Sequence, residues 1–147
     1  MTRATVRLDE GYTTRIQLRE FTIIADEPVE DGGSGLGATP REILLAALGA
    51  CAAITAKMYA TRKGWALESV EIDLSTERHK TDDYPAYTGE GDFVHEFHQR
   101  IVFTGDLTYE QKQRLLEIAG SCPVHRALTE PTHMIEELVD SIIAAEE

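Results

Sequence analysis

Residues 39–64 read TPREILLAALGACAAITAKMYATRKG, and this stretch decides the fold. Thr39 precedes a proline and stands three residues before a glutamate, which is the pattern of a capping box at a helix start. Apolar and small residues then predominate to about Arg62, and Lys63-Gly64 is typical of a helix end. The sequence therefore predicts one long helix over residues 39–62, with Cys51 at its centre.

This helix is apolar enough to raise the question of a membrane. The run 43–61 is about long enough to cross a bilayer. Lys57, the capping residues and the many alanines and glycines favour a helix buried in a protein core instead.

The rest of the chain predicts a single α+β domain over residues 1–147. A second capping box, Thr108 with Gln111, predicts a helix ending near Gly120, and Pro123 opens a short helix over 122–128. Segments rich in glycine, proline and polar residues predict loops at 26–38 and 77–92. Alternating apolar residues predict strands at 2–8, 13–18, 21–25, 67–76 and 93–103, and a last strand at 134–139. This order predicts helices packed on one face of an antiparallel sheet.

Composition excludes several classes of function. The formal net charge is −12 and the pI about 4.8, which argues against binding to nucleic acid or to an anionic membrane surface. Residues 1–10 are polar and do not resemble a signal peptide. With 42% hydrophobic residues and only two cysteines, we expect a globular protein of the reducing cytoplasm.

The two cysteines, 71 residues apart, stand in different surroundings. Cys51 lies among small residues of the long helix, where it is either a packing residue or a shielded thiol that needs a nearby positive charge to react. Cys122 precedes Pro123 and is the expected N-cap of the short helix, where free N–H groups favour a thiolate. His125, one turn on, could add a charge, although a capping cysteine beside a surface histidine is an equally good interpretation.

A pair of such thiols suggests redox chemistry. One thiolate attacks a peroxide and becomes a sulfenic acid, and the second thiol condenses with it to form a disulfide. A metal site is a weaker hypothesis, because the chain has no CxxC motif and His95 and His98 are expected on opposite faces of a strand. We therefore expect no metal site.

Several blocks of this sequence together resemble the OsmC/Ohr family, and in particular its small OsmC-like branch. They are 25–28, 32–33, the run from Gly37 to Cys51, 58–60, 63–65, the turn at 105–108 and the CPVHR sequence at 122–126. The order and the spacing of these blocks are those of the family, and they cover nearly the whole chain.

The resemblance implies an intertwined homodimer in which antiparallel sheets pack around long central helices that carry the cysteine. It also implies active sites at the dimer interface and defence against oxidative stress by thiol-dependent reduction of organic hydroperoxides, and more weakly of hydrogen peroxide. The position of Cys51 matches the peroxidatic cysteine, and that of Cys122 the resolving cysteine. The implied reductant is a dithiol such as a lipoylated protein, and the implied chemistry uses no metal, haem or other cofactor.

The sequence departs from the family at two points. The peroxidases of the family place a glutamate directly after the helix-opening proline, whereas here that residue is Arg41 and the glutamate follows as Glu42. Glu42 lies about 13 Å from Cys51 along the helix and on its opposite side, so neither Arg41 nor Glu42 can reach Cys51 of the same straight helix. Either residue could serve the cysteine of a partner chain, or Glu42 could act only as a helix cap. The family also uses an arginine from an N-terminal strand, for which Arg15 and Arg19 are the nearest candidates.

Three functions are consistent with these residues. The first is a homodimeric thiol peroxidase with Cys51, Cys122, Glu42 and an arginine (Arg15, Arg19 or Arg41) in its site. The second is a weak or inactive relative that binds a small apolar ligand at the dimer interface. The third is a redox sensor that signals through the same disulfide.

Overall fold

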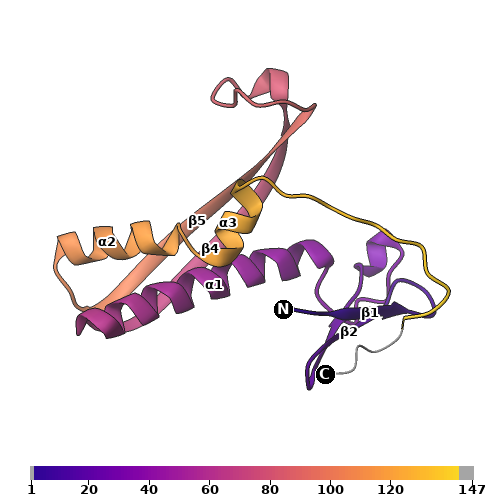
Figure 1. Ribbon diagram of the computed structural model, residues 1–147, viewed down its shortest axis with the longest axis horizontal. Helices are drawn as coiled ribbons and strands as arrows, with labels where there is room; N and C mark the ends of the chain where they lie inside the picture. Colours follow the sequence, from indigo (N-terminus) through magenta and orange to yellow (C-terminus); the bar gives the residue numbers. More distant parts are fainter. Residues whose placement is uncertain (1, 143–147) are drawn as a thin grey trace.

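The computed structural model describes residues 2–142 (Figure 1). Its elements in chain order are β1 (Thr5–Leu8), β2 (Thr14–Leu18), β3 (Phe21–Ala25), η1 (Val29–Asp31), α1 (Pro40–Lys63), β4 (Ala66–Lys80), η2 (Thr81–Asp83), β5 (Phe93–Asp106), α2 (Tyr109–Ala119) and α3 (Pro123–Thr129). The expected mixed α+β class is confirmed.

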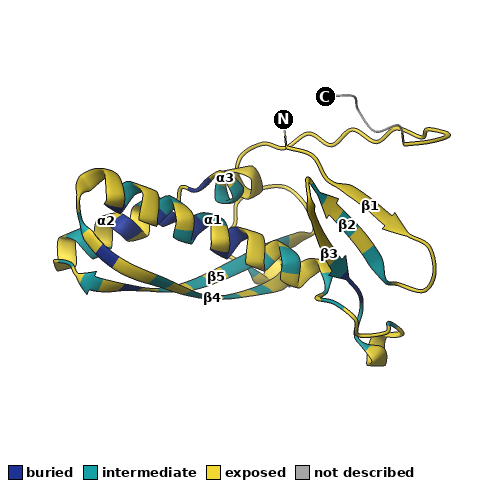
Figure 2. Cartoon of the chain, turned by 90° about the horizontal axis from the view of Figure 1, so that it is seen from below, coloured by how far each residue is buried: buried dark blue, intermediate teal, exposed yellow. Residues whose placement is uncertain are grey.

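The strands form two separate antiparallel sheets. β1, β2 and β3 make a three-stranded sheet in sequence order, and β4 and β5 make a long two-stranded ribbon. Figure 2 shows α1 and α2 on the same face of the ribbon, with the three-stranded sheet lying beyond the start of α1. The expectation of helices on one face of an antiparallel sheet therefore holds for the ribbon.

The long helix has the predicted ends. The Thr39 hydroxyl accepts from the Glu42 amide and the Glu42 carboxylate accepts from the Thr39 amide, so the capping box is complete. Gly64 ends the helix at a φ of 67°, in the left-handed region that glycine adopts without strain. At Gly49 a Cβ atom would lie 2.7 Å from Cδ1 of Leu74, so this glycine lets α1 approach the ribbon closely.

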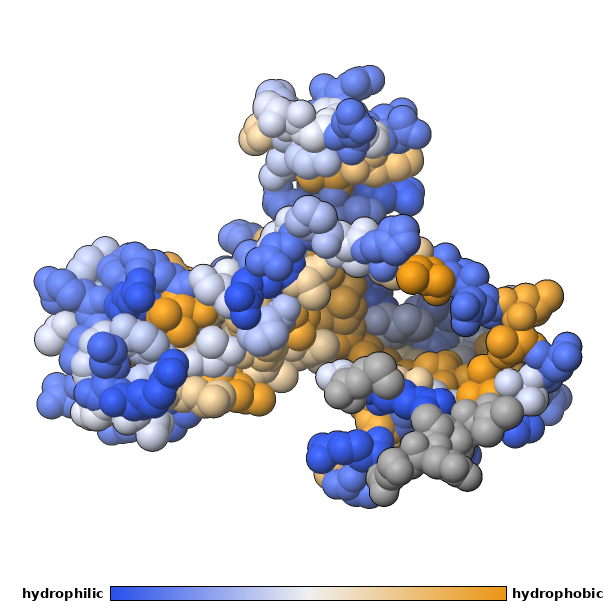
Figure 3. All heavy atoms as spheres, in the orientation of Figure 1, coloured by the Kyte–Doolittle hydropathy of each residue, from blue (hydrophilic) through white to orange (hydrophobic). Residues whose placement is uncertain are grey.

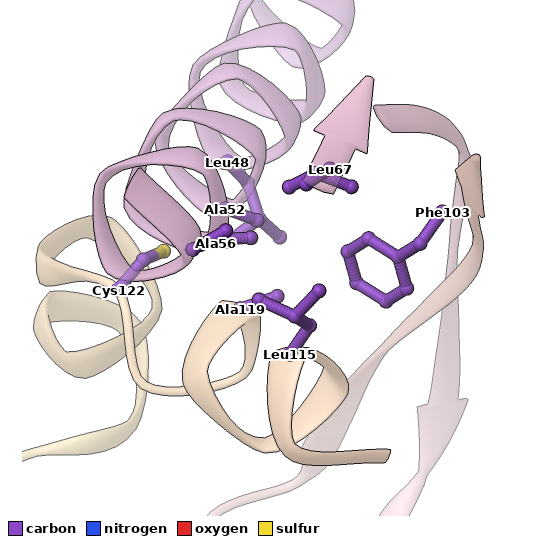
Figure 4. Close-up of a cluster of buried hydrophobic side chains, with 9 residues drawn as sticks. Leu48, Ala52, Ala56, Leu67, Phe103, Leu115, Ala119 and Cys122 are labelled. Carbon is purple, nitrogen blue, oxygen red and sulfur yellow. The ribbon is translucent and has the colours of Figure 1, made fainter. Parts of the chain in front are cut away.

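The core lies where α1, α2 and the ribbon meet. Every fourth residue of α1 from Leu48 to Ala60 is buried, and α2 contributes Leu115 and Ala119 (Figure 4). Leu67 and Phe103 close the cluster from the ribbon. Small side chains on both helices allow their backbones to approach, and this brings the chain after α2 against α1.

Two sequence predictions differ from the structure. The ribbon strands are longer than expected, because polar residues at 77–80 continue the pairing with residues 93–96. The prediction of a last strand at 134–139 is wrong, since this segment has no regular secondary structure. Its side chains Met134, Ile135 and Leu138 are exposed, and within residues 2–142 no strand pairs with it. A β-strand needs hydrogen bonds from a neighbour, which an apolar sequence cannot itself provide.

Candidate functional site

The fold brings the two cysteines together. Cys51 lies midway along α1 and packs against the buried cluster that contains Cys122. The Val124 amide donates to Cys51 Sγ at 3.5 Å, and the next amide, that of His125, donates to Cys122 Sγ at 3.4 Å. Two consecutive N–H groups at the start of α3 therefore bind the two sulfur atoms.

Local sequence explains this arrangement. Cys122 is the N-cap residue of α3, with an extended backbone, and Pro123 follows at the first helical position. Because proline has no N–H group, the first free amides of the helix belong to the two residues after it. In Figure 4 the Cys122 side chain points toward α1, beside Ala56 and Ala52.

The two thiols differ in how far they are buried. Cys122 is fully buried, whereas Cys51 is half-buried. Burial raises the pKa of the Cys122 thiol above its ordinary value, and hydrogen bonding and charge interaction with Cys51 add to this, against the opposing effect of the His125 and Val124 amides. The site thus holds a protonated, enclosed thiol next to a thiol that small molecules can reach. A two-cysteine reaction needs such a pair, because one thiol must meet the substrate and the other must be protected from it.

Glu42 acts as a helix cap within this chain. Its Oε2 accepts from the Thr39 amide at 2.7 Å, and this hydrogen bond, together with that of the Thr39 side chain, lowers the pKa of the Glu42 carboxyl below its ordinary value. The capping interpretation of Glu42 is therefore satisfied by geometry. A role at the cysteine of a partner stays a prediction.

The candidate arginines lie at the far end of α1 from the core. Arg15 is exposed on β2, opposite Ile24 of β3. Arg19 has a φ of 54° in the turn between β2 and β3, and its guanidinium lies 5.3 Å from the Phe21 ring centre. Arg41 lines a hollow of about 540 Å³ together with Glu27, Thr39 and Pro40.

Within residues 2–142 no hydrogen bond joins any of these three arginines, or Glu42, to a cysteine sulfur. One chain thus brings together Cys51 and Cys122 from the predicted set, and it leaves the charged candidates apart from them. Among the described residues no three histidine, cysteine or acidic side chains are grouped as metal ligands would be.

Sequence reasoning missed two features of this region. The Val124 amide is a backbone group, and only the folded position of α3 shows that it meets Cys51. Asp26 is buried at the end of β3 and accepts several hydrogen bonds. An aspartate directly between an apolar strand and a glycine-rich loop was the available signal for it.

Comparison with known proteins agrees with this picture. The family model described as OsmC-like protein matches residues 32–137, which include both cysteines and the whole of α1. No curated protein sequence matches the chain.

Solved structures share the fold at low sequence identity. An OsmC-like protein of Mycoplasma pneumoniae is 21% identical with a TM-score of 0.71, and the match covers 88% of each chain. The organic hydroperoxide resistance protein OhrB of Bacillus subtilis is 19% identical with a TM-score of 0.61, covering 88% of this chain and 91% of that one. An organic hydroperoxide resistance protein of Legionella pneumophila is 20% identical with a TM-score of 0.64, covering 88% and 90%.

Proposed function

Because this chain belongs to the OsmC-like protein family, we propose that it is a thiol-dependent peroxidase that reduces organic hydroperoxides, and hydrogen peroxide more weakly. The observation that carries the proposal is the binding of the Cys51 and Cys122 sulfur atoms by consecutive amides of α3. This geometry sets a half-buried thiol beside a fully buried one.

The chemistry balances with these two residues. The Cys51 thiolate attacks the outer oxygen of the hydroperoxide, the O–O bond breaks, and the leaving alkoxide takes a proton to become an alcohol. Cys51 is then a sulfenic acid. The Cys122 thiol condenses with it, so that an S–S bond forms and water leaves. An external dithiol, such as a lipoylated protein, returns two electrons by thiol–disulfide exchange.

The proposal includes a homodimer, and the surface of the single chain supports it. The accessible surface is 11677 Å². A compact folded monomer of this mass exposes about 7,500 Å². Figure 3 shows three lobes, with apolar atoms along the hollow between them. The excess is of the size of the area that obligate dimers bury, so a second copy is the natural cover.

The apolar face of α1 supports the same partner. Only 28% of its most apolar stretch is buried. By length and composition this helix could cross a membrane, as core helices of other proteins also could. Leu44 and Met58 are exposed and lie seven residues to either side of Cys51, so all three share one side of the helix. A second α1 packed along this side would enclose Cys51 in the dimer interface.

Such packing would also supply the missing charges. If the two α1 helices cross antiparallel near Ala46 and Ala47, the N-terminus of one helix approaches Cys51 of the other. Arg41 and Glu42 of one copy, and Arg15 from its β2, are then the groups proposed to hold the thiolate and the peroxide. The shift of the glutamate by one position makes Arg41 the side chain of greatest interest.

Mass spectrometry after a peroxide pulse tests the proposal. The reduced protein is mixed briefly with stoichiometric cumene hydroperoxide or, separately, with hydrogen peroxide. We expect a loss of two hydrogen masses, mapped to a Cys51–Cys122 bond, and a faster loss with cumene hydroperoxide. The Cys51→Ser variant should show no such change.

Thiols that stay reduced for minutes in the wild type would contradict a peroxidase. The apolar, unpaired side of α1 would then favour the alternative function, binding of a small apolar ligand between two copies. Native mass spectrometry of the purified dimer would reveal such a ligand.

A further inference from the structure

Asp26 is the buried charged residue among residues 2–142. Its exposed fraction is 1%, and it lies just after β3, away from both cysteines in the sequence. A buried carboxylate costs free energy unless hydrogen bonds replace its lost water. Its position therefore calls for an explanation that the thiol chemistry alone does not give.

The Asp26 carboxylate joins two parts of the chain. Its Oδ2 accepts from the Thr13 hydroxyl at 2.9 Å and from the Leu36 amide at 3.2 Å, and its Oδ1 accepts from the Glu27 amide at 2.8 Å. Its own amide donates to the Ala38 carbonyl at 3.1 Å. The carboxylate thus links the residue that precedes β2 with the loop that leads into α1.

That loop is packed tightly upon itself. A Cβ atom at Gly33 would lie 1.9 Å from the Glu27 carbonyl oxygen, and one at Gly37 would lie 2.2 Å from the Ile24 carbonyl oxygen. Neither position can accept a side chain without a shift of the backbone. The path from β3 to the N-cap of α1 is therefore fixed, with Asp26 at its centre.

The two elements that Asp26 joins each carry one candidate arginine. Arg15 lies on β2, two residues after Thr13, and Arg41 lies in the first turn of α1, directly after the loop. We propose that Asp26 is a positioning residue that fixes Arg15 and Arg41 relative to each other, so that both face the cysteine of the partner. This inference rests on the proposed function, and it adds a residue that does not itself touch the reacting atoms.

The ionised form of Asp26 is the form that this role needs. Burial raises its pKa, but the Leu36 and Glu27 amides and the Thr13 hydroxyl outweigh burial, so the pKa lies below its ordinary value. At neutral pH the side chain is an acceptor only. Asparagine has nearly the same shape, but its NH₂ group is a hydrogen-bond donor. It would face one of the N–H groups whose hydrogen bond the carboxylate accepts.

The test compares Asp26→Asn with Asp31→Asn, which removes the same charge from an exposed position of the same loop. In Asp26→Asn we expect the Leu36 and Glu27 amides to exchange hydrogen faster, and Cys51 to react with cumene hydroperoxide about tenfold more slowly or worse. Disulfide formation driven by diamide should change less than twofold, because Cys51 and Cys122 are held by α1 and α3. Asp31→Asn should match the wild type in all three measurements.

A second readout does not depend on peroxidase activity. The pH at which iodoacetamide alkylates Cys51 at half its maximal rate should rise in Asp26→Asn, since misplaced arginines hold the thiolate less well. An unchanged alkylation profile and an unchanged peroxide rate, in a variant whose loop amides exchange faster, would overturn the positioning role. If the wild-type thiols do not react with peroxide but Asp26→Asn still shifts the alkylation profile, the peroxidase function would be rejected and the positioning role of Asp26 would stand.

Thr13→Val gives a milder variant should Asp26→Asn fail to fold. It removes one of the carboxylate's hydrogen bonds and leaves its charge in place. We expect the same changes as in Asp26→Asn, with the peroxide rate lowered by about threefold. A rate equal to that of the wild type would count against the proposal.

Discussion

At the scale of single residues, the two cysteines differ because of their surroundings and not because of their chemistry. Cys122 is enclosed by α1, α2 and α3, and a peroxide molecule has no direct path to its sulfur. Cys51 is half-buried, and the exposed Leu44 and Met58 lie seven residues to either side of it on α1. Attack by Cys51 followed by resolution by Cys122 is therefore the order that the geometry favours.

Removal of the Cys122 thiol, which we propose to be the resolving one, should expose Cys51 to over-oxidation. In Cys122→Ser we expect one equivalent of cumene hydroperoxide to give a sulfenic acid at Cys51, and an excess to add a second and third oxygen atom. The wild type under the same excess should stop at the disulfide. Intact-protein mass spectrometry separates these products. Over-oxidation of Cys122 in Cys51→Ser at a similar rate would show that enclosure does not protect it.

The reduced protein should lose stability at alkaline pH. The pKa of the Cys122 thiol is raised in the folded state, mainly by burial, so the unfolded thiol ionises at a lower pH than the folded one. Its contribution to the free energy of unfolding is complete below the unfolded pKa and is lost as pH rises toward the folded pKa.

Guanidinium unfolding at pH 7, 9 and 10, with reductant present, measures this loss. Cys122→Ser should show a smaller decrease between pH 7 and 10 than the wild type, because serine does not ionise in this range. Equal decreases in the two proteins would assign the effect to other groups.

At the scale of secondary-structure elements, helix α1 depends on its first turn. Glu42→Ala removes the carboxylate that accepts from the Thr39 amide, and we expect it to lower the free energy of unfolding. Glu42→Gln retains an acceptor oxygen and should cost less than half as much. Chemical denaturation of both variants gives the comparison.

The same pair of variants separates a cap from a role in the site. A cap predicts nearly wild-type peroxide rates for Glu42→Gln. A carboxylate that acts at the partner's Cys51 predicts a large loss of rate in a fully stable protein. The second outcome would contradict the interpretation of Glu42 as a cap alone.

The elements also show what a sequence can predict. Both capping boxes, the glycine end of α1 and the proline start of α3 use contacts within a few residues, so their patterns place the helices correctly. The 134–139 segment fails because a strand depends on a distant neighbour. The meeting of Cys51 with the Val124 amide depends on how α2 returns the chain to α1, which no local pattern contains. The roles proposed for Arg15 and Arg41 depend on a second copy.

At the scale of the whole molecule, one chain does not make one compact body. The core joins α1, α2 and the ribbon, while the three-stranded sheet lies at the other end of α1 (Figure 2). Val6, Leu8 and Phe21 of that sheet are each more than half exposed. A chain with this much exposed apolar surface and a net charge of −12 remains soluble more easily when two copies cover each other's faces.

A charge on the open side of α1 should therefore separate the copies. Ile54 is 60% exposed, so Ile54→Glu leaves the chain's own core intact while placing a carboxylate in the proposed interface. We expect the wild type to sediment at twice the 16.3 kDa of one chain and Ile54→Glu to shift toward the single-chain mass. Val29→Glu adds the same charge at a residue that is 69% exposed and outside α1, and should stay dimeric.

Peroxide reduction should follow the assembly, because the charged groups that we propose to assist Cys51 come from the other copy. Ile54→Glu should lose its reaction with cumene hydroperoxide in proportion to its dissociation. Raising the protein concentration should restore part of the dimer and, with it, part of the reaction. Diamide should still join Cys51 to Cys122 in the dissociated chain, because both sulfur atoms are held within one copy. A monomeric Ile54→Glu with the full peroxide rate would show that one chain is sufficient, and it would remove Arg15, Arg41 and Glu42 from the site.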